Sequence, residues 1–397
     1  MRAPTLDHTF AEALPEMTVP ATAAEFPDPH VVVLNDALAR ELGLDPEWLR
    51  SAEGTAWLAG SAGGHATAYA GHQFGQFVPL LGDGRALLLG DINGTEIQLK
   101  GSGPTPFSRP GSDGFGAVGP MLREYLISEF MHAVGVPTTR SLAVLTTGAT
   151  VVRREGAVPG GIVVRAASSH LRIGSVQFAA TQSPELVERV ITAAGADSAA
   201  ELLRTVLQRQ ISLVASWMRL GFVHGVMNTD NTALSGETID YGPCAFTEKF
   251  DPRAKFSSID VSGRYAFGQQ PSIIAWNLAR LAEAMVPLIT AETAQDILNG
   301  AQDMWNKQWA REVPDPQRLA QAEDITTFNA EHHSGPIFIP RNRLLASAIT
   351  SAERDGDYAP YRELIAAVTD PFNPAARPAR FAAPEGDERP FVTYCGT

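Results

Sequence analysis

The sequence predicts an α+β protein, and two observations carry this prediction. Before residue 180, short apolar runs have the length and alternation of strands, and Asn93-Gly94 between two of them is a strong hairpin signal. After residue 180, apolar residues recur at spacings of three or four, which is typical of amphipathic helices. A strand-rich first part followed by a helical second part favours the α+β class.

Residues 1–60 mix proline-rich stretches with short helical patterns at 36–42 and 46–51. Gly43 stops the first of these patterns, as a glycine does after a helix. We interpret residues 1–60 as a lead-in that packs on a later domain.

Strands are predicted at 86–89 and 96–100, on either side of the Asn-Gly turn. A period of two places Ile97 and Leu99 on one face of the second strand and Glu96, Gln98 and Lys100 on the other.

A loop rich in Gly, Pro and Ser at 101–119 leads into a predicted helix at 121–134, which ends at Gly135 with Pro137 just beyond. Further strands are expected within 140–178.

The second half begins with a predicted amphipathic helix of about 20 residues, marked by Leu203, Leu207, Ile211, Val214 and Met218. Four further helices are expected, at 272–289, 291–307, 342–354 and 360–368. The chain after Asp370 is rich in Pro and Ala and carries little pattern.

Composition limits the classes of function. The 397 residues carry a net charge of -13, which argues against nucleic acid and anionic membranes as partners. Two cysteines, Cys244 and Cys395, give no disulfide framework and indicate a reducing compartment. The N-terminus lacks the apolar core of a secretory signal, and no apolar run approaches the roughly 18 residues of a membrane span. We expect a cytoplasmic, soluble monomer.

The segment His224–Asn231, followed by Asp240-Tyr-Gly242, resembles the catalytic and metal-binding loops of protein kinases. His224 and Asn231 are in register with that pattern, but Val226 occupies the place of the catalytic Asp and cannot accept a proton. Asn231 and Asp240 offer hard oxygen ligands that suit Mg²⁺ or Mn²⁺ held largely by nucleotide phosphates. The adjacent Asp230 could take a proton from an attacking hydroxyl. The alternative is ordinary turn chemistry.

Two further groups are candidate nucleotide contacts. Lys100 ends a strand and Glu124 lies in an apolar helix, where a carboxylate needs a cation, so the two could pair as in kinases. Arg165 and Arg172 could clamp a polyphosphate, and Gly82-Asp-Gly-Arg85 could offer backbone N–H groups. The alternatives are a solvated strand end with a surface ion pair, two surface arginines and a plain hairpin turn.

Eight blocks of the sequence resemble the signature blocks of the selenoprotein O (SelO) family, over about residue 25 to the C-terminus. The blocks are Tyr69-Ala-Gly-His-Gln-Phe-Gly-Gln-Phe77, Gly82-Asp-Gly-Arg85, Leu99-Lys-Gly-Ser-Gly-Pro-Thr-Pro106, Arg123-Glu-Tyr-Leu126, Gly221-Phe-Val-His-Gly-Val-Met-Asn-Thr-Asp-Asn231, Ile239-Asp-Tyr-Gly-Pro243, Gly263-Arg-Tyr-Ala-Phe-Gly268 and Trp276-Asn-Leu278.

This resemblance implies a two-lobed, kinase-like (pseudokinase) fold with a strand-rich N-lobe and a helical C-lobe. It also implies ATP bound in a flipped orientation and AMP transfer to Ser, Thr or Tyr hydroxyls of client proteins, with release of pyrophosphate. The implied roles are proton acceptor for Asp230, Mg²⁺ or Mn²⁺ ligands for Asn231 and Asp240, phosphate contact for Lys100, its ion-pair partner for Glu124, and ATP contacts for Gly82, Gly84, Arg85, Asp113, Gly114, Arg165, Arg172 and Asp240. With the α-phosphate facing the acceptor, the position of Val226 loses its relevance.

The sequence departs from the family pattern in the loop before the helix. One extra residue separates Lys100 from Glu124, and Ser112-Asp-Gly-Phe115 stands where Gly-Asp-Gly-Arg is usual, which weakens Asp113 and Gly114 as ATP contacts. Cys395 lies where eukaryotic relatives carry selenocysteine, so a redox link to Cys244 is a hypothesis. The alternative is a buried Cys244 and an unlinked tail thiol.

We expect four parts of the chain: a lead-in at 1–60, an N-lobe with phosphate contacts at 61–180, a helical C-lobe with the catalytic and metal loops at 181–375, and a tail with Cys395 at 376–397. Two other functions compete with adenylyl transfer. A small-molecule kinase of the aminoglycoside-phosphotransferase type would need an Asp at Val226, and a non-catalytic nucleotide-binding pseudokinase would not need metal ligands.

Overall fold

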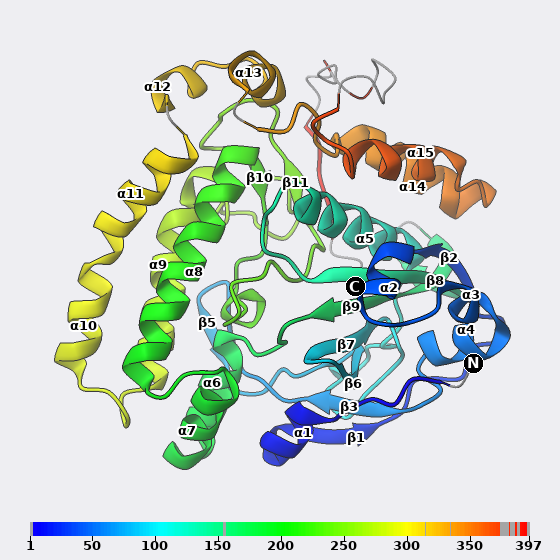
Figure 1. The fold of residues 1–397 in the computed structure, drawn as a ribbon, viewed down its shortest axis with the longest axis horizontal. Helices are drawn as coiled ribbons and strands as arrows, with labels where there is room; N and C mark the ends of the chain where they lie inside the picture. The colour runs from blue at the N-terminus through cyan, green and yellow to red at the C-terminus, as the bar shows by residue number, and fades with distance from the viewer. Residues whose placement is uncertain are drawn as a thin grey trace.

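The computed structural model describes residues 3–153, 156–313, 315–333, 335–373, 381, 386 and 390–394. Within these residues the protein is α+β, as predicted, with an antiparallel sheet and many helices. In Figure 1 α8 (Ala199–Leu220), α9 (Gln270–Ala284), α10 (Ala291–Asn299) and α11 (Ala301–Glu312) stand together at the left, and the main sheet lies to their right.

Seven strands form the main sheet, and every neighbouring pair is antiparallel. Their order is β1 (Thr18–Ala21), β3 (Gly64–Thr67), β6 (Ala86–Ile92), β7 (Thr95–Lys100), β9 (Gly156–Ala167), β8 (Arg140–Arg153) and β2 (His30–Leu34). Both edge strands come from the first 34 residues, so the N-terminal segment is part of the sheet.

Two small ribbons lie outside the main sheet. They are β4 (Gly71–Gln73) with β5 (Gln76–Val78), and β10 (Phe222–Val223) with β11 (Ala245–Phe246). The 3₁₀ turns are η1 (Pro15–Met17), η2 (Thr229–Asn231) and η3 (Phe267–Gln269). The turn η2 holds the Asp-Asn pair that the sequence singled out.

The helices of the first half are α1 (Thr9–Ala13), α2 (Asp36–Glu41), α3 (Pro46–Arg50), α4 (Ala52–Leu58), α5 (Val118–Ala133), α6 (Ile173–Gln182) and α7 (Pro184–Ala193). Those of the second half are α8 (Ala199–Leu220), α9 (Gln270–Ala284), α10 (Ala291–Asn299), α11 (Ala301–Glu312), α12 (Pro316–Leu319), α13 (Ile325–His332), α14 (Asn342–Asp355) and α15 (Ala359–Val368). No helix in the described ranges is long and apolar enough to cross a membrane.

The sheet separates two apolar cores, because side chains alternate along each strand. Ile97 and Leu99 of β7 pack in the core that contains Leu49 and Trp57 from α3 and α4. On the other face, Leu88 of β6 belongs to the larger core with α5 and α8. The predicted face of Ile97 and Leu99 is therefore confirmed, and Gln98 and Lys100 point to the opposite side.

Three predictions of local structure need correction. The helix expected from residue 121 begins at Val118, because Pro120 fits a first turn, where no backbone N–H is required. Residues 173–178, expected as strand, lie in α6, since a short apolar run does not distinguish strand from buried helix. The helix expected at 291–307 is two helices, interrupted at Gly300, whose residue type disfavours a helix interior.

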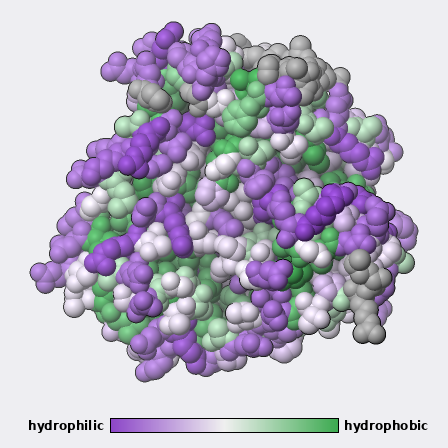
Figure 2. All heavy atoms as spheres, in the orientation of Figure 1, coloured by the Kyte–Doolittle hydropathy of each residue, from purple (hydrophilic) through white to green (hydrophobic). Residues whose placement is uncertain are grey.

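The surface carries many hydrophilic side chains, as the net charge of -13 leads us to expect (Figure 2). Hydrophilic side chains cover most of the face in Figure 2, and they are dense over α11, a helix with no buried residue. At the other extreme, α8 buries a full apolar face and ends at Gly221, whose φ of 72° is left-handed and suits glycine. From this helix end the chain continues into β10 and then into the loop that contains His224.

Candidate active site

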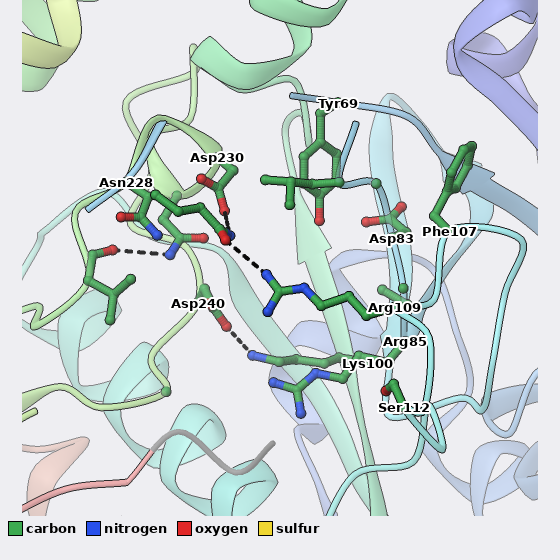
Figure 3. A pocket seen from close by; sticks show the side chains of 18 of the residues that line it. Tyr69, Asp83, Arg85, Lys100, Phe107, Arg109, Ser112, Asn228, Asp230 and Asp240 are labelled. Carbon is green, nitrogen blue, oxygen red and sulfur yellow. Dashed lines mark hydrogen bonds and ion pairs between the residues drawn. The ribbon is translucent and has the colours of Figure 1, made fainter. Parts of the chain in front are cut away.

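A pocket of about 580 Å³ lies between the sheet, the 107–112 loop and the His224–Asn231 segment. Figure 3 shows its side chains converging from both sides. Ten of the residues predicted for the site line this pocket: Gly82, Gly84, Arg85, Lys100, Glu124, Arg165, Arg172, Asp230, Asn231 and Asp240. Segments more than a hundred residues apart in the sequence thus meet at one cavity.

Four charged residues form a cluster at the base of the pocket, in which Lys100, Glu124 and Arg165 are buried and Asp240 is partly exposed. Lys100 Nζ lies 2.8 Å from Glu124 Oε2 and also pairs with Asp240 Oδ1. Arg165 pairs with Glu124 Oε1 and lies 3.4 Å from Asp240 Oδ1. The predicted pairing of Lys100 with Glu124 is therefore present, and two cations balance two carboxylates.

The cluster keeps both carboxylates ionised. Burial alone would raise the pKa of Glu124, but the charges of Arg165 and Lys100 hold it below its ordinary value. The pKa of Asp240 is likewise depressed, because Lys100 and Arg165 outweigh the effect of burial. Asp240 therefore presents a negative charge that suits a metal cation.

His224 braces the loop and does not reach the pocket. Its ring is fully buried, and Nε2 lies 3.0 Å from the carbonyl oxygen of Ile239, to which it must donate because a carbonyl only accepts. Burial lowers the pKa of His224, so the ring is neutral. The bond fixes the residue before Asp240, whose φ of 65° is one that Asp tolerates better than most residues.

Asp230 is held in the 3₁₀ turn η2 with its carboxylate buried. Oδ2 accepts a hydrogen bond from Gln73 Nε2 at 3.1 Å, and Oδ1 has no hydrogen-bond partner among the described residues. Burial raises the pKa of Asp230 above its ordinary value. The site therefore contains a carboxylate that is a candidate proton acceptor, with its Oδ1 packed against Gly71.

Asn231 is oriented by the residue that replaces the kinase Asp. Its Nδ2 donates to the carbonyl oxygen of Val226 at 3.0 Å, which leaves the amide oxygen for another ligand. Oxygen ligands from Asn231 and Asp240 fit Mg²⁺ or Mn²⁺, which need few protein ligands when phosphates supply the rest. The described residues hold no group of three or more His, Cys, Asp or Glu that could bind a metal ion.

The Gly82–Arg85 turn is fixed by Asp83, a buried residue that the prediction passed over. Asp83 Oδ2 accepts from the backbone N and the hydroxyl of Thr67 at 3.1 and 2.6 Å. A side chain at Gly82 would collide with the ring of Phe107, so the glycine is needed for packing. This arrangement directs the turn, with Arg85, toward the pocket.

Arg172 lines the pocket beside Asp230. Its guanidinium stacks 4.3 Å from the centre of the Tyr69 ring, and NH1 donates to the backbone carbonyl of Asp230 at 3.2 Å. The other terminal nitrogen, NH2, is buried without a hydrogen-bond partner among the described residues. Arg172 therefore keeps a donor for an anionic group.

Asp113 and Gly114 do not line the pocket. Asp113 is paired with Arg153 at 2.8 Å, which lowers the pKa of the Asp113 carboxyl. Gly114 packs against Gly103 and Pro104, where a Cβ would collide with backbone. The departure of this loop from the usual family sequence agrees with its position away from the ligand groups.

The cysteines are only partly described. Cys244 is fully buried, its Sγ donates to the Tyr241 carbonyl at 3.2 Å, and burial raises the pKa of its thiol. Cys395 lies outside the described residues. The nearby Thr393 donates its hydroxyl to the carbonyl of Pro243 at 2.6 Å, so the tail passes beside the Cys244 segment. A redox link between the cysteines stays a prediction.

Several lining residues were not predicted as site residues: Tyr69, Gln73, Asp83, Arg109 and Asn228. The Tyr69–Phe77 segment was one of the eight blocks that carry the family resemblance, but none of its residues was predicted to have a role in the site. Arg109 lies in the 101–119 loop, in which only Asp113 and Gly114 were predicted as ATP contacts. The signal that could have identified these lining residues was the presence of polar side chains within these segments.

Known proteins resemble the chain along almost its whole length. The family model described as protein adenylyltransferase SelO matches residues 5–331. Three relatives, each named protein nucleotidyltransferase YdiU, come from Corynebacterium efficiens (42% identical; 99% of this chain and 96% of the relative covered), Mycolicibacterium smegmatis (43%; 99% and 98%) and Pseudarthrobacter chlorophenolicus (42%; 98% and 97%). The alignments extend over 478 to 481 positions, so these relatives contain stretches that the 397-residue chain lacks.

Proposed function

The chain belongs to the SelO family of protein adenylyltransferases, and we propose that its pocket is where AMP passes from ATP to Ser, Thr or Tyr hydroxyls of client proteins. The observation that carries this proposal is that Asp230, Asn231 and Asp240 line one cavity. Asn231 and Asp240 offer oxygen ligands that suit a metal ion, and the Asp230 carboxylate has one oxygen without a hydrogen-bond partner among the described residues. A valine at position 226 leaves the kinase position without a base.

In the proposed reaction the acceptor hydroxyl oxygen attacks the α-phosphorus of ATP. The bond from that phosphorus to the oxygen bridging it to the β-phosphate breaks, and pyrophosphate leaves. The hydroxyl proton passes to the Asp230 carboxylate, which must lie within hydrogen-bond reach of the acceptor hydroxyl. The product is a phosphodiester that joins AMP to the client side chain.

Positive groups surround the place proposed for the triphosphate. Lys100 and Arg165 are already balanced by Glu124 and Asp240, so they can orient phosphates without adding a large net charge. Arg172 offers its unpartnered buried nitrogen, and Arg85 lines the same cavity. Fixed donors of this kind stabilise charge that develops on the phosphates during transfer.

Asn231 and Asp240 would hold Mg²⁺ or Mn²⁺, whose contribution is to neutralise phosphate charge. Gly82 and Gly84 are assigned to backbone contacts with ATP. Asp113 and Gly114 stay only as remote candidates, because they do not line the pocket.

The kinase-like, two-lobed fold is part of the proposal. It is supported by the order of a strand Lys, a helix Glu, the His224 loop and Asp240 along the chain, and by their meeting at one cavity. We keep the division at residues 60, 180 and 375, with β1 and β2 joining the lead-in to the sheet. A cytoplasmic monomer also remains a prediction from composition.

One experiment separates adenylyl transfer from the two competing functions. The protein is incubated with Mg²⁺ or Mn²⁺, candidate acceptors (client proteins and small molecules), and ATP labelled at either the α- or the γ-phosphate. Label on protein from the α-phosphate alone supports the proposal. Label from the γ-phosphate would indicate a kinase, and binding of ATP without either label on an acceptor would indicate a nucleotide-dependent binding module.

A further inference from the structure

The β4–β5 hairpin docks on the catalytic loop and not on the main sheet. Three consecutive hairpin residues each donate one hydrogen bond to the three residues that precede Asn231. These bonds run from His72 N to Thr229 Oγ1 (2.7 Å), from Gln73 Nε2 to Asp230 Oδ2 (3.1 Å) and from Phe74 N to Asn228 Oδ1 (3.1 Å). The central bond is the only one of the three that reaches a carboxylate.

The orientation of the Gln73 amide is fixed by its second partner. Arg109 NH2 lies 2.9 Å from Gln73 Oε1, and an arginine can only donate hydrogen bonds. The atom that faces Arg109 must therefore be the amide oxygen. It follows that the amide nitrogen faces Asp230, so the bond to Oδ2 is donated by Gln73. Figure 3 shows Arg109 extended across the pocket, with a dashed line at its guanidinium that marks a hydrogen bond.

This bond distinguishes the two oxygens of Asp230. Gln73 occupies Oδ2, whereas Oδ1 is buried and has no partner among the described residues. Within those residues, Gln73 is the side chain that donates to this carboxylate. Gln73 therefore holds one oxygen of the carboxylate and Gly71 packs against the other, and a carboxylate fixed in this way needs less ordering to reach the reactive geometry.

We propose that Gln73 is a positioning residue for adenylyl transfer: its amide holds the Asp230 carboxylate through Oδ2, and Arg109 holds the amide. The inference rests on the proposed role of Asp230 as proton acceptor. Because Gln73 acts through Asp230, its loss slows transfer and leaves ATP binding intact.

Two substitutions separate this role from simple packing. Gln73→Met keeps the length of the side chain but removes both hydrogen bonds. Gln73→Glu keeps an acceptor for Arg109 and replaces the donor to Asp230 with a carboxylate oxygen, which adds like-charge repulsion. Both variants should lower kcat about 10- to 100-fold, the range expected for a lost hydrogen bond to a charged group, with the KM for ATP unchanged. Gln76→Met, on the exposed partner position of the same hairpin, is the matched control and should keep the wild-type kcat.

The readouts are kcat and KM for AMP transfer, ATP affinity and the melting temperature of each full-length variant. Wild-type kcat in Gln73→Glu would overturn the proposal, because the Arg109 bridge alone would then suffice. A loss that appears in the KM for ATP, or that follows a drop in melting temperature, would overturn it too.

A double-mutant cycle with Asp230→Asn distinguishes failure of the Gln73 positioning role from failure of the proposed function. If Gln73 acts through the Asp230 carboxylate, Gln73→Met should cost less than about twofold in the Asp230→Asn background. An equal cost in both backgrounds would overturn the positioning role. Wild-type kcat in Asp230→Asn alone would instead overturn the assignment of Asp230, whatever the Gln73 variants do.

Discussion

Gly71 lies directly against Asp230, with no room for a side chain between them. A Cβ on residue 71 would overlap Oδ1 of the carboxylate and come too close to its carbon atoms. The φ of Gly71 is not in the left-handed region, so the backbone conformation would allow an alanine. Only the close contact with Asp230 excludes the methyl group. The hairpin and the carboxylate are therefore packed as one unit.

The first prediction follows from this contact. Gly71→Ala should displace either the hairpin or Asp230, and a shift of about 1 Å at a reacting group can cost on the order of 100-fold in rate. The measurement is kcat for AMP transfer together with ATP affinity, which should change little. Gly300→Ala, at a position with space for the methyl group, is the control. Wild-type kcat in Gly71→Ala would show that the contact has no bearing on transfer.

Glu124 is expected to matter for stability as well as for ATP binding. Glu124→Gln removes one negative charge from a buried cluster and leaves Lys100 and Arg165 to share Asp240. Removing one partner of a buried ion pair costs about 3 kcal/mol or more. Urea unfolding should report this loss, whereas Glu47→Gln, in an exposed pair, should change stability by less than about 0.5 kcal/mol. Equal stabilities for the two variants would rule out the cluster as a source of stability.

The sequence predicted the central elements of this cluster because their signals are local. Strand alternation placed Lys100 on the face opposite Ile97 and Leu99, and an isolated carboxylate in the apolar segment around Glu124 indicated a need for a cation. The meeting of β7 and α5 then followed from the order of the elements. Boundaries were less secure where local signals conflict, as at Pro120 and Gly300.

The hairpin contacts could not be predicted in the same way. Gln73 and Asp230 are 157 residues apart, and nothing in the local pattern of either residue indicates the other. Arg109 lies in a loop whose glycine, proline and serine content gave no direction to its side chain. Such contacts depend on how the hairpin docks on the loop, which only the folded chain determines.

Metal dependence should reside in Asp240. Asp240→Asn keeps a residue that tolerates the positive φ but loses the charge that would attract a cation. In the wild type, ATP should bind more tightly with Mn²⁺ than with EDTA. In the variant the two titrations should coincide, and AMP transfer should be abolished. A preserved difference between Mn²⁺ and EDTA would place the metal elsewhere.

Acid should remove one source of stability outside the pocket. Arg341 NH1 lies 2.7 Å from Asp324 Oδ2. Burial alone would raise the pKa of Asp324, but the hydrogen bond and the positive charge of Arg341 hold it below its ordinary value. A depressed carboxylate pKa stabilises the fold above about pH 4 and loses that effect as the pH falls through the folded-state pKa. The wild type should therefore be more stable than Asp324→Asn at pH 7, and the gap should narrow below about pH 4.

Urea unfolding of both proteins at pH 7 and pH 3 measures this gap. Asp28→Asn, whose carboxylate is exposed, is the control and should follow the wild type closely. A gap between wild type and Asp324→Asn that is independent of pH would mean that the Asp324 charge does not contribute.

The assignment of the proton acceptor to Asp230 is tested most directly by single-turnover AMP transfer from ATP labelled at the α-phosphate. With ATP saturating, Asp230→Asn should transfer label at least about 100-fold more slowly than the wild type, the scale of a lost general base. Its ATP affinity should stay within about twofold of the wild type, because the carboxylate acts on the acceptor and not on the nucleotide. Transfer by Asp230→Asn at the wild-type rate would contradict the assignment.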